Sequence, residues 1–163
     1  TWSARKNILQ YIKSQKIETG EAKLWLYSFA NTSLDLYSDI GVFCNNYFLL
    51  TENLQNQLLK YHNQKNSNIG QLTKSGKSLH DLVNSEIIIL NSKKNKLINN
   101  FLLALTEENP VTIFEQNQKQ VCQIRLRQLQ NSDELTNSEM NILTEIANKC
   151  PYEEGNAVYE AKM

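Results

Sequence analysis

Two long stripes of apolar residues at helical spacing constrain the fold of this chain more than any other feature of its sequence. The first lies between Leu34 and Tyr61, where apolar residues recur every three or four positions, as on one face of a long helix. Its members are Leu36, Ile40, Phe43, Tyr47, Leu50, Leu54, Leu58 and Tyr61. The second stripe, from Leu79 to about Glu107, has Leu79, Val83, Ile87, Leu90, Leu97, Phe101 and Leu105 as its members. A polar segment, 62–78, separates the two stripes, so the sequence predicts an antiparallel helical hairpin over residues 34–107.

The composition favours an all-α fold around this hairpin. The chain has 163 residues, which fits one domain over 1–163 with a single core. It contains 5 Gly and 2 Pro, too few for the many turns of a multi-stranded sheet. We therefore expect a helical bundle in which shorter helices pack at the base of the hairpin.

The shorter helices are predicted from apolar spacing and from capping signals. Residues 3–14 form an amphipathic segment, and 21–29 is apolar on most sides, so we expect a short helix buried by its neighbours. In the C-terminal region, 112–163, capping boxes at Thr112-Ile113-Phe114-Glu115 and Thr136-Asn137-Ser138-Glu139 mark two helix starts. The second helix should direct Met140, Leu143, Ile146 and Ala147 inward. Pro151 should end that helix, and a last helix after Gly155 should continue to Met163.

Charge and hydropathy give no support to a nucleic-acid or membrane partner. Lys plus Arg number 17 and Asp plus Glu number 17, so the formal net charge is zero. Such a balance provides no general attraction for a polyanion. The longest apolar runs, such as 87–90 and 101–105, are far shorter than the roughly 20 residues that span a bilayer. We expect no membrane span within these residues.

The cysteines leave two interpretations open. Cys44, Cys122 and Cys150 are odd in number and have no Cys-x-x-Cys spacing, which argues against a zinc site. Cys122 and Cys150 lie on successive predicted helices and could form a disulfide. They are unequally distant from the turn between those helices, however, which favours buried thiols instead.

No catalytic, cofactor-binding or metal-binding residue is predicted. His62 and His80 have no partner in the pattern and are interpreted as surface or capping residues, and the Lys93, Lys94 and Lys96 group as a solvated face. Gly76-Lys77-Ser78 lacks the earlier Gly and the preceding strand of a phosphate-binding loop. Asn31-Thr32-Ser33 matches an N-glycosylation acceptor but also suits a capping turn before the long stripe.

The C-terminal region resembles a known helical region of exported bacterial proteins. The segments concerned are 109–121, 124–126, Ile146-Ala147-Asn148-Lys149-Cys150-Pro151-Tyr152 and Gly155-Asn156-Ala157-Val158-Tyr159-Glu160-Ala161-Lys162. They resemble the region that precedes the C-terminal sorting domain of Bacteroidetes secreted or surface proteins of the type IX secretion pathway. Lys162 departs from that pattern, which often has Arg there. The resemblance implies an extracellular or cell-surface location and a fragment of a longer exported protein, since the sorting domain itself is missing.

Together these features predict a non-enzymatic helical module of an exported cell-surface protein. Its partner would be another protein or other domains of the same chain, with no cofactor. The alternative is an intracellular helical adaptor that binds a partner helix in a groove.

Overall fold

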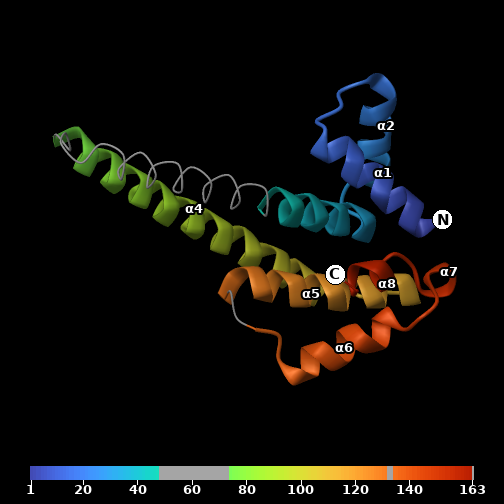
Figure 1. Cartoon of the computed structure of the whole chain (residues 1–163). Helices are drawn as coiled ribbons and strands as arrows, with labels where there is room; N and C mark the ends of the chain where they lie inside the picture. Colours follow the sequence, from blue (N-terminus) through green and yellow to red (C-terminus); the bar gives the residue numbers. More distant parts are fainter. Residues whose placement is uncertain (48–73, 132–133, 163) are drawn as a thin grey trace. The chain divides into compact units, whose positions relative to one another are not determined.

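The computed structural model describes residues 1–47, 74–131 and 134–162, and all regular structure in these ranges is α-helical (Figure 1). The elements are α1 (Trp2–Ser14), α2 (Gly20–Phe29), α4 (Lys74–Glu107), α5 (Ile113–Asn131), α6 (Asn137–Ala147), α7 (Pro151–Glu154) and α8 (Ala157–Glu160). Residues 33–47 are also helical. The predicted all-α fold class is confirmed.

The chain divides into two compact units. Unit 1 comprises Thr1–Cys44 and Ile98–Met163, and unit 2 comprises Asn45–Leu97. The expectation that 1–163 forms one domain stays a prediction. The buried polar groups discussed below lie in unit 1, with the exception of Lys94.

Within each unit, the 33–47 helix contacts α4. In unit 1 the rings of Phe43 and Phe101 lie 5.5 Å apart. In unit 2 the Lys94 ammonium lies 5.0 Å from the centre of the Tyr47 ring. Position 43 thus contacts position 101 within unit 1, and position 47 contacts position 94 within unit 2. The rest of the first stripe, 48–61, and most of the predicted tip, including His62 and Gly70, lie outside the described residues.

The return helix differs from its prediction at its start and in its buried face. It begins at Lys74 rather than Leu79, so Gly76-Lys77-Ser78 lies inside a helix and not in a loop. Its buried face is set by Lys94 and Ile98, whereas Leu97, placed in the stripe by the sequence, is 45% exposed. Lys94 is only 9% exposed, so its assignment to a solvated face was wrong. It donates a hydrogen bond to the Tyr47 hydroxyl at 3.3 Å.

Side-chain caps fix the helix starts that the sequence predicted. At α6, the Glu139 amide donates to the Thr136 hydroxyl at 3.2 Å, and the Thr136 amide donates to the Glu139 carboxylate at 3.0 Å. Thr112 and Glu115 make the equivalent pair at the start of α5, at 3.3 and 3.0 Å. Both capping boxes are therefore confirmed. Each satisfies amide donors that the first turn of a helix leaves unpaired.

A third predicted turn, at residues 31–33, also forms. The Asp35 amide donates to the Thr32 hydroxyl at 3.4 Å, and the Asn31 amide donates to the Asp35 carboxylate at 3.2 Å. Asn31 has a φ of 60°, which Asn tolerates better than most residues. The capping-turn interpretation of this segment is confirmed.

The core of unit 1 forms around α5. Val121 packs with Ile146 of α6 and with Ala157 and Val158 of α8. Other hydrophobic side chains with 1% exposure or less are Leu9, Tyr37, Ile40, Cys44, Ile98, Leu105 and Leu126. These residues come from α1, the 33–47 helix, α4 and α5. The shorter helices thus share one core with the part of α4 that belongs to unit 1.

Three details of the shorter helices were predicted wrongly. Met140 is 54% exposed rather than inward, because the α6 face that meets the core is formed by Ile142, Leu143 and Ile146. The last helix ends at Glu160, with Ala161 as its C-cap, and does not continue toward Met163 as one longer helix. Residues 151–154 form the separate turn α7, with Pro151 at its first position, where a missing amide costs nothing. The turn α7 is an addition to the prediction. The third wrong detail is the exposure of α2, which is described below.

Candidate functional site

The most polar part of the interior is a cluster that joins α1, α5 and α8. Lys6 is 2% exposed, and its ammonium donates to the Gln118 side-chain oxygen at 2.9 Å and to the Glu160 carboxylate at 2.5 Å. The Gln118 amide nitrogen donates to the second Glu160 oxygen at 2.9 Å. Arg125 lies 3.4 Å from that same oxygen. One carboxylate of α8 thus receives two cations and an amide from two other helices.

The cluster keeps Glu160 ionised. Burial of this carboxyl acts to raise its pKa, but the charge and hydrogen bond of Lys6, the Gln118 amide and the Arg125 charge outweigh burial, so the pKa lies below its usual value. A carboxylate with these partners has little tendency to take up a proton near neutral pH. It therefore suits holding helices together better than general acid or base catalysis.

Two thiols lie in the same interior, and both are protonated and poorly nucleophilic at neutral pH. Cys122 accepts a weak hydrogen bond from the Gln118 amide at 3.5 Å. Burial raises the pKa of Cys122 to about 12 and that of Cys44 to about 11. Because the thiolate is the nucleophile, neither group is poised to react at neutral pH while it stays buried.

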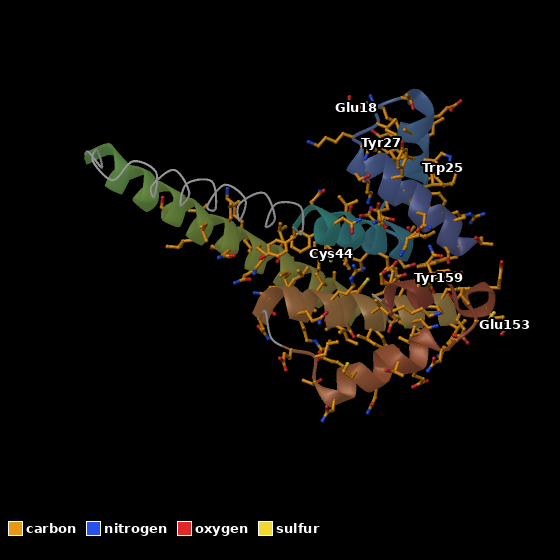
Figure 2. All side chains as sticks on the ribbon, in the orientation of Figure 1. Glu18, Trp25, Tyr27, Cys44, Glu153 and Tyr159 are labelled. Atoms are coloured by element: carbon orange, nitrogen blue, oxygen red, sulfur yellow. The ribbon has the colours of Figure 1, made fainter. Side chains whose placement is uncertain are left out.

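The cysteines are free, which decides between the two interpretations of the sequence. Cys44 and Cys122 are buried thiols, as one interpretation expected, and Cys150 is exposed. Cys122 and Cys150 are not bridged, and the expectation of burial was wrong for Cys150. Figure 2 labels Cys44 on the helix 33–47 and Tyr159 on α8.

A second polar link connects α5 to α7. The Asn117 side-chain amide is buried and donates to the Glu154 carboxylate at 2.7 Å and to the Glu154 carbonyl at 3.2 Å. Lys149 lies 3.7 Å from the Glu154 carboxylate and donates to the Asn117 oxygen at 3.5 Å. This link holds α7 at its tertiary position.

Other candidate chemistry is not assembled in the described ranges. There, no group of three or more His, Cys, Asp or Glu side chains is arranged to hold a metal ion. Within the same ranges, no helix is long and apolar enough to cross a membrane. His80 belongs to α4, but its side chain, like all of His62, lies outside the description. Glu107 ends α4 and is exposed, as expected for a helix end.

The exposure of α2 is another feature that the sequence predicted wrongly. This helix was expected to be buried on most sides, yet Leu24 is 68% exposed and Tyr27 is 80% exposed. Ala22 alone among the residues of α2 is buried. The recess beside Leu24 has a volume of about 450 Å³ and is open to solvent, lined by Glu21, Leu24, Trp25, Ser28 and Phe29. The Trp25 and Phe29 rings are tilted against each other, with 5.4 Å between ring centres. Figure 2 labels Trp25 and Tyr27 on α2.

Counted from Glu21, the other lining residues of this recess follow three, four, seven and eight positions later, so all of them share one face of α2. A helix that is apolar all round is normally covered by other elements. Here the rest of unit 1 covers only part of it. The apolar pattern of 21–29 predicts a helix that needs cover, but it does not indicate which surface would provide that cover.

Comparison with protein families, curated proteins and solved structures gives no match to this chain.

Proposed function

We propose that this chain is a non-enzymatic helical module that binds another protein through α2. The observation that carries the proposal is the exposure of large apolar side chains on this helix, with Leu24 and Tyr27 mostly in water. Single exposed apolar residues are common on protein surfaces. A short helix that exposes two large apolar side chains beside an open recess is more typical of an interaction surface.

The partner that fits this surface is an amphipathic helix with a basic residue near one end. The recess is apolar in its middle, at Leu24, Trp25 and Phe29, and has the exposed carboxylate of Glu21 at one end. A partner helix would place apolar residues at three- and four-residue spacing along this face. A Lys or Arg of that helix would lie opposite Glu21, and this pairing would set the direction of binding more than its strength.

The non-enzymatic part of the proposal is supported by the state of the buried groups. The negative charge of Glu160 is balanced by the positive charges of Lys6 and Arg125, and the thiols of Cys44 and Cys122 have raised pKa values. These are the features of a group held for structure, whereas catalytic groups are tuned toward the working pH.

The location that we propose is the cell surface, as part of a longer exported protein. Its support is the resemblance of the C-terminal region to the segment that precedes a type IX sorting domain. One observation favours the alternative of an intracellular adaptor with the same docking face. Cys150 is an exposed free thiol, and exposed thiols persist most readily in a reducing compartment.

Site-specific photo-crosslinking tests the docking face. A benzophenone amino acid is placed at position 27 in the protein as its own cells make it, and at position 152 as the matched control. Tyr152 is also an exposed tyrosine, at 94% against 80% for Tyr27, but it lies on α7. Position 27 does not line the recess but lies three residues from Leu24, which does. We expect position 27 to crosslink to a helical segment with the predicted apolar and basic pattern, and the added variant Leu24→Glu to abolish that product.

Equal crosslinking at 27 and 152, or a product unaffected by Leu24→Glu, would refute the docking proposal. Protease treatment of intact cells separates the two locations: a surface protein is cleaved and an intracellular adaptor is protected. A purified chain that catalyses turnover of a substrate would contradict the non-enzymatic assignment.

A further inference from the structure

The segment from Cys150 to Lys162 is attached to unit 1 by contacts on two sides. We call these residues the strap. On its apolar side, Ala157 and Val158 lie in the core with Val121 and Ile146. On its polar side, Glu160 binds Lys6 and Arg125. In Figure 1 the strap is the red segment that carries the labels α7 and α8.

The strap depends on these contacts for its own structure. Its helices α7 and α8 have 4 residues each, far fewer than a helix needs to be stable alone. Between them Gly155 has φ 86° and ψ −173°, a conformation that essentially only glycine adopts. The strap can therefore lose its order as one piece once its contacts fail, while α5 keeps a continuous helix of 19 residues.

The charged contacts that hold the strap against α1 and α5 meet at Glu160, and we call this carboxylate the lock. The charged and titratable groups that act on this carboxylate are Lys6 from α1, Arg125 and Cys122 from α5, and Cys44 from the 33–47 helix. Two cations therefore face one carboxylate. If the strap leaves, Lys6 keeps the Gln118 oxygen as a partner but loses its anion in a buried position. Such a loss is costly, which makes the Lys6–Glu160 pair a strong tie on the strap.

Opening of the strap would uncover a thiol and an apolar groove. The Gln118 amide nitrogen donates both to Glu160, at 2.9 Å, and to the Cys122 sulfur, at 3.5 Å, so Cys122 lies directly behind the lock. The groove beneath α8 is formed by α5 and α6, through Val121, Ile142, Leu143 and Ile146. We propose that the strap is a releasable cover, locked by Glu160 on Lys6, and that its local opening exposes Cys122 and this groove while the rest of unit 1 stays folded.

The proposed opening of the strap is separate from the docking function of α2. Thiol labelling under native conditions tests it. The background variant is Cys150→Ser, which removes the exposed thiol. An aromatic disulfide reagent is added, whose central bond is broken by the Cys122 thiolate, giving a mixed disulfide and one coloured thiolate. We compare Glu160→Gln with Glu153→Gln, an exposed carboxylate on the same strap. Peptide mass mapping identifies the modified cysteine.

We expect Glu160→Gln to raise the rate of Cys122 labelling by about 10- to 100-fold, because removal of a buried charge partner favours the open form. Glu153→Gln should leave the rate within about twofold, as for most exposed sites. The rate in Glu160→Gln should depend weakly on denaturant, since a local opening exposes little surface. Equal rates in the two variants, or a denaturant dependence equal to that of global unfolding, would overturn the proposal.

Hydrogen exchange of the unaltered chain decides the matter if Glu160→Gln does not fold. The amides of α8 that bond within the strap, such as Ala161 to the Ala157 carbonyl at 2.9 Å, should exchange faster than those in the middle of α5. A strap that exchanges as slowly as α5 would show that it opens only when unit 1 unfolds, and the proposal would be wrong.

Discussion

Replacement of Gly155 by alanine should destabilise unit 1 through two separate effects. The first is backbone strain, because φ 86° with ψ −173° is a region open to glycine and costs other residues about 1–3 kcal/mol. The second is overlap, because an added Cβ would lie 2.6 Å from a Phe114 ring carbon and 3.2 Å from the Ser3 hydroxyl. The Phe114 ring must shift to remove the overlap, at about 1 kcal/mol or more.

Summed, Gly155→Ala should lower the free energy of unfolding by about 2–4 kcal/mol. Urea denaturation followed by circular dichroism at 222 nm measures this loss. Gly20→Ala is the matched control, because a Cβ there would meet nothing within 4 Å and Gly20 is the first residue of α2. Its effect should lie between zero and a gain of about 1 kcal/mol, since alanine favours helix more than glycine does.

A double variant separates the two effects. Phe114→Ala removes the ring, including the Cδ1 atom that a Cβ at 155 would overlap. In that background Gly155→Ala should cost only the backbone part, about 1–3 kcal/mol. If Gly155→Ala alone matched Gly20→Ala, the positive φ at 155 would be absent in solution, and the reasoning about the turn between α7 and α8 would be refuted.

Three further predictions concern packing, capping and acid. Ile146→Ala should cost about 2–5 kcal/mol in urea denaturation because it leaves a cavity in the core, whereas Met140→Ala on the exposed side of α6 should cost under about 0.5 kcal/mol. Thr136→Ala should cost about 1 kcal/mol by the same assay, and a loss below about 0.3 kcal/mol would contradict the capping box. Glu160 has a folded-state pKa below the unfolded value of 4.5, so its contribution is complete above pH 4.5 and is lost as pH falls through the folded pKa. Glu160→Gln should therefore flatten the fall of stability below pH 4.5, and an unchanged acid profile would contradict the buried pair.

The sequence predicted the long elements and the helix starts because their signals are local. Apolar spacing over many turns identifies a helix without knowledge of what covers it, and a capping box is complete within four residues. The boxes at Thr112 and Thr136 form as predicted. The register of the buried face was harder to predict, since Leu97 and Ile98 are adjacent and both apolar, and only the tertiary contacts select Ile98.

The buried lysines escaped prediction because charge was taken as a sign of exposure. Lys6 lies at helical spacing between Trp2 and Leu9, and Lys94 lies four residues before Ile98. A cation at such a position signals a buried partner, but the partner can be far along the chain. For Lys6 that partner is Glu160, 154 residues away, which no local pattern can indicate. The same limit explains α2, whose apolar residues predict burial but not by which surface.

Amide hydrogen exchange of α2 in the protein's native cellular assembly, compared with the purified 163-residue chain, tests the central claim of a docking face most directly. If α2 is covered by a partner helix, its amides from about Lys23 to Phe29 should gain protection of tenfold or more in the assembled state, while those of α5 change little. Equal exchange of α2 in the two states, with the protein in its native cellular assembly, would contradict the claim that the exposed face of Leu24 and Tyr27 serves binding.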